Sequence, residues 1–187
     1  QDDLNKMHKW IEYHKWKLKS KTYTALTGWE KPPVLMTRVE FGLLGHYNRY
    51  KKSPFETFDV GGDGMTGYSQ YATDPIALRG YENSALTPNR YYYGYAYTRL
   101  GLELRYPLML EATTSIYAAA FVEGGNAWRN VGDFNPFDLK RSAGVGVRIF
   151  LPMVGLMGID WAYGFDKVFG SSSAGGSHFH FVLGQEF

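Results

Sequence analysis

Apolar and polar residues alternate strictly along several long segments of this 187-residue chain, and this pattern limits the possible folds most strongly. In the segment 95–107, one parity is mostly apolar, whereas the other includes Arg99, Gly101, Glu103 and Arg105. Successive side chains of a β-strand point to opposite faces, so this alternation is typical of a strand with one apolar and one polar face. The pattern therefore predicts a chain built mainly from two-faced strands.

Seven segments fit a strand, and turn residues such as Gly, Pro and Asn separate them. They are 10–26, 35–47, 95–107, 114–128, 139–151, 157–165 and 178–187; segment 114–128 is apolar on both parities apart from Glu123. No helical period runs beyond about two turns, which argues against alternating strands and helices. The stretch from 48 to 92 is rich in Gly, Tyr, Asp and Pro and is too long for an idle connection, so we expect it to be functional.

The face that points inward distinguishes a soluble sandwich from an outer-membrane barrel, in which apolar residues face lipid and polar residues line the lumen. The polar parity is rich in glycine, which suits a packed lumen better than a solvated surface: Gly101, Gly144, Gly146, Gly158, Gly164 and Gly184. Aromatic residues, 17% of the chain, gather at strand ends, as girdles at the two membrane interfaces do. These features favour a membrane barrel.

Composition excludes several other classes. The net charge of +2 gives no support for nucleic-acid binding, and the absence of cysteine excludes a disulfide framework or a thiolate metal site. No apolar run approaches the ~18 residues of a transmembrane helix, and the first residues do not resemble a secretory signal. Neither a phosphate-binding loop nor a nucleophile elbow is visible. The sequence therefore predicts no enzyme, no cofactor and no metal site.

Several strings, in order, resemble the BamA-type barrels of the outer-membrane protein assembly machinery. Leu78-Arg79-Gly80-Tyr81 is similar to the V/I-R-G-F/Y motif of that family, and residues 179–187, from Phe179 to Phe187, resemble its terminal β-signal. Four further strings match neighbouring parts of the family: 53–56 with Gly61-Gly62, 102–104 with Pro107, 121–125, and 141–144. The motif differs slightly from the family pattern, because Leu78 and Tyr81 stand where the family often has Val and Phe. Residues 63–77 look like an insertion ahead of the motif.

The resemblance covers about residues 9–187 and implies a fold. Residues 1–187 would form the C-terminal portion of a sixteen-stranded transmembrane β-barrel, all-β, with about seven antiparallel strands in this chain. Loop 48–92 would insert into the lumen, and 178–187 would be the terminal strand. The early strands and the periplasmic POTRA domains of the family would lie outside this chain.

The resemblance also implies a function: a non-enzymatic insertase in the bacterial outer membrane, which folds and inserts barrel proteins through a lateral seam. Its partners would be nascent barrel proteins, accessory lipoproteins or other assembly subunits, and membrane lipids. The seam would include Phe179, Phe181, Leu183, Gly184 and Phe187 of the terminal strand. A passive porin, another barrel without insertase activity, and a barrel hydrolase are the alternatives.

A buried arginine in the loop needs carboxylate partners, because an unpaired charge is costly away from water. The candidate partners of Arg79 are Glu103, which lies on the polar parity of its strand, and Glu123, which by the resemblance faces the lumen of the next strand. Gly80 would permit a tight turn or close approach to the wall. The alternative is an exposed arginine with solvated glutamates. Two carboxylates could also serve a glycosidase, and His178 with His180 could hold a metal, but paired carboxylates and plain lumenal histidines are the simpler interpretations.

Overall fold

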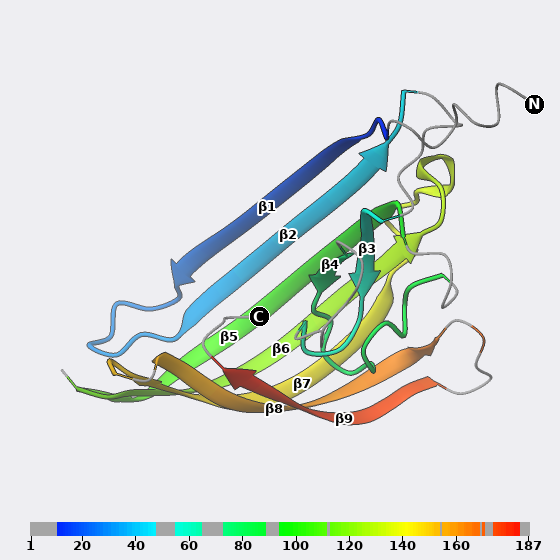
Figure 1. Cartoon of the computed structure of the whole chain (residues 1–187). Helices are drawn as coiled ribbons and strands as arrows, with labels where there is room; N and C mark the ends of the chain where they lie inside the picture. Colours follow the sequence, from blue (N-terminus) through cyan, green and yellow to red (C-terminus); the bar gives the residue numbers. More distant parts are fainter. Residues whose placement is uncertain are drawn as a thin grey trace, which may run out of the picture.

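Seven long strands form one antiparallel sheet in the order β1-β2-β5-β6-β7-β8-β9 (Figure 1). This computed structural model describes residues 11–47, 55–64, 73–88, 94–111, 113–153, 155–168, 170 and 174–183. The seven strands are β1 (His14–Ala25), β2 (Val34–Gly45), β5 (Ala96–Leu110), β6 (Ser115–Trp128), β7 (Lys140–Leu151), β8 (Gly155–Lys167) and β9 (Ala174–Leu183). The predicted seven antiparallel strands are confirmed. In this sheet β1 and β9 are the two edges, so it is not closed.

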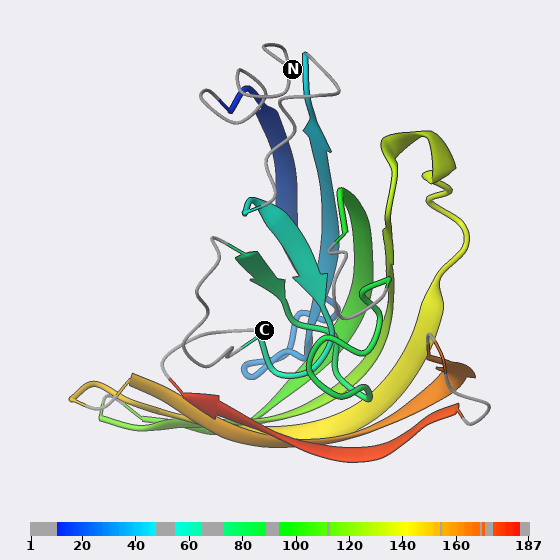
Figure 2. The same cartoon turned by 45° about the vertical axis from the view of Figure 1, so that its right-hand side comes forward.

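The sheet is a curved wall, and the described parts of the segment between β2 and β5 lie on its concave side (Figure 2). Neighbouring strands in sequence pair throughout, except that β2 pairs with β5 across this long segment. The β5–β6 register shifts between Pro107 and Met109, where a proline cannot donate a ladder hydrogen bond. Within the described residues the only helical element is the short 3₁₀ turn Val131–Asp133, and no helix there has the length and apolar character needed to span a membrane.

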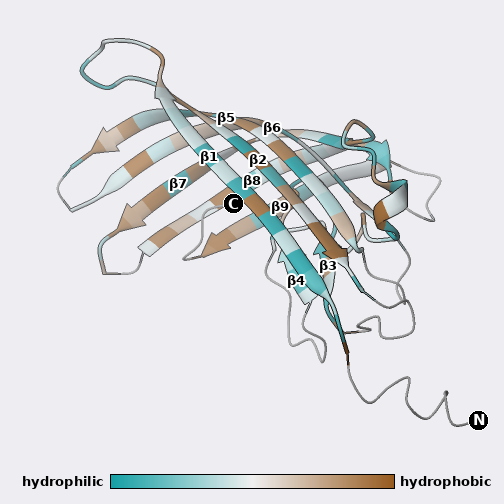
Figure 3. Cartoon of the chain, turned by 90° about the horizontal axis from the view of Figure 1, so that it is seen from above, coloured by the Kyte–Doolittle hydropathy of each residue, from teal (hydrophilic) through white to brown (hydrophobic). Residues whose placement is uncertain are grey.

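The two faces of the wall carry opposite kinds of side chain, and Figure 3 shows hydrophilic and hydrophobic residues alternating along the strands. In β5 the Leu102 side chain is 46% exposed on the outer face, whereas the adjacent Glu103 is 3% exposed on the inner face. In β9 Phe179 is 68% exposed and His180 only 6%. Apolar residues therefore point away from the enclosed side and polar residues point into it, which is the arrangement of a membrane barrel.

Glycines on the inner face make room for the large side chains of neighbouring strands. A Cβ added at Gly146 would lie 1.7 Å from Oδ1 of Asp160, and one at Gly158 would lie 2.5 Å from Cδ of Arg148. The inner wall is thus packed by glycines on one strand and charged side chains on the next. This packing gives a physical reason for the glycine-rich parity in the sequence.

The segment between β2 and β5 has its own small fold, which the sequence did not indicate. Strands β3 (Thr57–Val60) and β4 (Thr73–Ile76) pair in parallel, and a bridge between Gly62 and Leu78 continues the pairing. A hydrophobic core joins this small fold to the wall; it comprises Phe58, Val60, Ile76, Leu78, Tyr81 and Leu86 with Leu44, Tyr97 and Ala127 of the wall strands. The core fixes the position of the residues that follow β4.

Candidate functional site

Residues 78–81 follow β4 and rest on the inner wall of the sheet. Leu78 is fully buried, and its backbone N–H donates to the carbonyl of Gly62 at 3.1 Å. Its side chain lies against Gly125 of β6, where an added Cβ would come within 3.3 Å of both Cδ atoms. Leu78 therefore anchors the start of the motif to the loop and to the wall, and it directs the next three residues over β5 to β9.

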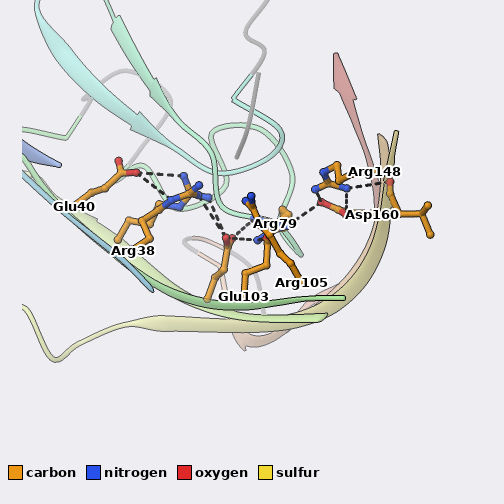
Figure 4. A network of polar contacts seen from close by, with 10 residues as sticks. Arg38, Glu40, Arg79, Glu103, Arg105, Arg148 and Asp160 are labelled. Carbon is orange, nitrogen blue, oxygen red and sulfur yellow. Dashed lines mark hydrogen bonds and ion pairs between the residues drawn. The ribbon is translucent and has the colours of Figure 1, made fainter. Parts of the chain in front are cut away.

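Arg79 is completely buried, and its guanidinium contacts carboxylates from three strands (Figure 4). Nη2 lies 2.8 Å from Oε2 of Glu103 in β5 and 2.6 Å from Oε1 of Glu123 in β6. Nη1 lies 3.0 Å from Oδ2 of Asp160 in β8. The guanidinium carbon also stacks 3.3 Å from the ring centroid of Phe121, which adds a cation–π contact.

The carboxylates around Arg79 also bind arginines of the wall, so the charges form one network. Asp160 makes a two-point contact with Arg148, and Glu123 lies 3.1 Å from Arg99. The network also includes Arg38, Glu40 and Arg105. Burial alone would lower the pKa of Arg79, but the attraction of Glu123, Glu103 and Asp160 raises it above its ordinary value, so the side chain stays charged.

Gly80 occupies a position that suits no other residue. Its φ is +86°, and an added Cβ would lie 2.8 Å from Cβ of Ser142 and 3.0 Å from backbone atoms of Tyr163 and Gly164. Residues with a side chain rarely adopt this φ, and the wall leaves no space for one. The Gly80 N–H donates to Nε2 of His180 at 2.9 Å, which connects the loop to the terminal strand β9.

Tyr81 completes the motif at the far strands. Its ring fills the space left by glycines: Cβ atoms added at Gly164 and Gly175 would lie 2.9 Å and 2.6 Å from ring carbons. Its hydroxyl donates to the carbonyl of Arg141 at 2.6 Å and accepts from the backbone N–H of Asp166 at 3.4 Å. Burial raises the pKa of Tyr81 to about 12, so the hydroxyl remains a donor.

A second set of ion pairs holds the loop to the opposite edge of the sheet. Nζ of Lys15 in β1 lies 2.8 Å from Glu56 and 2.5 Å from Asp74, and Nζ of Lys17 lies 3.0 Å from Asp74. These side chains are 21% to 30% exposed, so solvent weakens the pairs. The loop therefore contacts both edge strands, β1 and β9. Its buried charged residue, Arg79, contacts β5, β6 and β8.

The structure brings Arg79 into contact with both glutamates expected from the sequence. It adds two contacts of the motif that the sequence analysis missed, namely Asp160 with Arg79 and His180 with the Gly80 N–H. Asp160 was not considered as a partner; its signal was a carboxylate between glycines on one parity of β8. His180 was considered only as a metal ligand or a plain lumenal residue. Phe179, Phe181 and Leu183 lie on the outer face of β9, 60% to 68% exposed. Gly184 and Phe187 lie outside the described residues, as do residues 65–72 of the expected insertion.

The arrangement favours docking over covalent chemistry. Glu103, Glu123 and Asp160 are each bound by at least one arginine, so all three carboxylates are occupied by ion pairs. Within the described part of the chain, no group of three or more His, Cys, Asp or Glu residues is placed to hold a metal ion. What the four residues 78–81 do is connect strands that are far apart in the sequence.

Comparison with known families identifies the fold. The model of the Omp85 superfamily domain matches residues 3–187. This chain belongs to the Omp85 superfamily. Among solved structures, the crystal structure of BamA from Haemophilus ducreyi lacking POTRA domains 1–3 is similar, with a TM-score of 0.65 and 18% sequence identity. No curated protein matches the chain significantly.

The BamA similarity covers 91% of this chain and 35% of the BamA chain, so this Omp85 chain spans about a third of that structure. At this identity the similarity shows the fold: the seven-stranded sheet corresponds to part of a BamA-type barrel. The resemblance found in the sequence is thereby confirmed at the level of family and fold.

Proposed function

We propose that this Omp85 chain forms the C-terminal barrel portion of the central subunit of an outer-membrane protein assembly machinery. In this role it folds and inserts nascent β-barrel proteins in the bacterial outer membrane, without covalent chemistry or a cofactor. The terminal strand is one side of a lateral seam, which offers its unpaired edge to incoming strands by β-augmentation. Accessory lipoproteins or other assembly subunits, together with membrane lipids, are its further partners.

One observation carries this proposal: residues 78–81 contact every strand from β5 to β9. Arg79 reaches β5, β6 and β8, Gly80 reaches β9, and Tyr81 reaches the start of β7. A loop bound to five strands on the lumenal side would restrain the wall near its last strand. Such a restraint is expected of a barrel that opens beside that strand. A passive pore, the alternative, gains nothing from a lumen occupied by a docked loop.

The test replaces Arg79 by alanine in the full-length protein, in cells where that protein is the only copy. Arg141 serves as the matched control, because it is a wall arginine with one carboxylate partner, Asp166, and is 70% exposed. We expect Arg79→Ala to lower the amounts of other folded barrel proteins in the envelope, and Arg141→Ala to leave them unchanged.

The folded state of each variant is measured separately, by its resistance to unfolding in detergent without heating. A folded Arg79→Ala barrel with reduced assembly of other barrels supports the insertase role. A folded Arg79→Ala barrel with normal assembly would refute it and favour a barrel without insertase activity. If Arg79→Ala fails to fold, Arg79→Lys, which keeps the charge but loses the planar fork, takes its place in the same comparison.

A further inference from the structure

The terminal strand β9 places one buried, titratable side chain on its inner face, namely His180. This residue is 6% exposed, and its Nε2 accepts the hydrogen bond from the backbone N–H of Gly80 at 2.9 Å. Gly175, also in β9, packs against the ring of Tyr81. Of these contacts, the one to His180 is the directed polar contact between the motif and β9.

This hydrogen bond fixes the protonation state of the ring. A backbone N–H can only donate, so Nε2 of His180 must carry a lone pair and the ring must be neutral, with its proton on Nδ1. A protonated imidazole donates from both nitrogens. Protonation would therefore place two donors 2.9 Å apart, at Nε2 and at the Gly80 nitrogen, and the contact would break.

The charged groups around His180 do not remove the repulsion between a protonated Nε2 and the Gly80 N–H. Asp160 is its cross-strand neighbour in β8 and, with Asp63 of the loop, favours a protonated ring. Burial of the ring opposes protonation most strongly, and His178 of β9 itself, whose ring centroid lies 6.2 Å away, and Arg79 of the loop also oppose it. Asp160 is already bound to two arginines, which limits its attraction for a further cation.

We propose that His180 is a positioning residue that attaches the loop motif to the terminal strand, and that protonation of its ring releases β9 from the loop. Mild acid would then loosen the last strand while the arginine network, which stays charged, keeps the loop on β5, β6 and β8. The consequence for seam opening rests on the proposed insertase function. The contact and its response to acid do not, since they concern only this chain.

The experiment measures amide hydrogen exchange by mass spectrometry in the full-length protein, held in lipid nanodiscs. Peptides that cover residues 78–81 and β9 are followed at about pH 8 and about pH 5, on either side of the ordinary histidine pKa, with labelling times scaled to equal intrinsic exchange. Three variants are compared with the wild type. His180→Gln keeps an acceptor oxygen that does not titrate, His180→Ala removes the acceptor, and His178→Gln is the matched control.

At pH 8 we expect His180→Ala to exchange about tenfold faster than wild type in both peptides, the effect of leaving one buried donor unsatisfied. At pH 5 the wild type and His178→Gln should both be accelerated, whereas His180→Gln should stay protected. Equal acceleration of wild type and His180→Gln at pH 5 would overturn the acid response. Unchanged exchange of His180→Ala at pH 8 would overturn the attachment. The experiment measures amide exchange in this chain alone. Its result can therefore be interpreted even if the Arg79→Ala assembly test fails.

Discussion

Substitution of Gly80 by alanine should undock residues 78–81 from the wall. Alanine substitutions at two other glycines separate the cost of the backbone conformation from the cost of the close contact. At Gly80 two penalties combine: a φ of +86° and a Cβ only 2.8 to 3.0 Å from atoms of the wall. Gly155 has a φ of +91° with nothing within 4 Å of an added Cβ, so Gly155→Ala carries the backbone penalty alone. Gly132 has neither penalty and serves as the neutral control.

The left-handed backbone costs an alanine about 1 to 2 kcal/mol, and forcing a methyl group into a packed site costs about 1 to 3 kcal/mol more. We therefore expect Gly80→Ala to lower the free energy of unfolding by ~3 to 4 kcal/mol, Gly155→Ala by ~1 to 2 kcal/mol and Gly132→Ala by less than ~0.5 kcal/mol. Urea titration in lipid vesicles, followed by tryptophan fluorescence, measures all three.

A second substitution tests whether the close contact is the cause. Ser142→Gly removes the Cβ that lies 2.8 Å from the added methyl group, but the backbone atoms of Tyr163 and Gly164 at 3.0 Å remain. Ser142→Gly should therefore rescue Gly80→Ala only in part. If Gly80→Ala and Gly155→Ala have equal effects, the wall does not press on the motif, and the motif is not docked as closely as the contacts of Gly80 indicate.

The charged contacts give further predictions. Asp160→Asn should lower the free energy of unfolding by about 3 to 5 kcal/mol, because it leaves buried arginines without a compensating charge. Asp74→Asn, in a partly exposed pair, should change the free energy of unfolding by less than about 1 kcal/mol. Urea titration compares the two variants, and equal losses would contradict the role of burial. Arg79→Glu combined with Glu123→Arg should not restore barrel assembly, because residue 123 also faces Arg99 at 3.1 Å. Full rescue in the assembly assay would mean that the pair acts alone.

The strands and their faces could be predicted because both depend on local alternation, which the sequence displays directly. In β5 the alternation of Leu102, Glu103 and Leu104 sufficed to assign both faces. The small fold of the loop could not be predicted in this way. Strands β3 and β4 have only four residues each and pair in parallel, so neither shows a period, and their position depends on a core shared with the wall.

Residues of the candidate site were accessible to sequence reasoning where a family motif contained them or where strand alternation placed them on the polar face. Arg79 and Glu123 came from the BamA resemblance, and Glu103 came from the polar parity of its strand. Asp160 reaches Arg79 only because the β7–β8 register places it beside Arg148, and this register is a property of the assembled sheet. The partner of His180 is a backbone N–H, which no pattern of side chains can indicate.

The arginine network also determines when the loop can dock during folding. A buried guanidinium is stable only when carboxylates compensate it, and the three that contact Arg79 come from positions 103, 123 and 160 on three different strands. Until β5, β6 and β8 are aligned, these carboxylates are far apart and Arg79 remains better solvated in water. We therefore expect docking of the loop to follow alignment of β5, β6 and β8, so that the motif stabilises the assembled sheet.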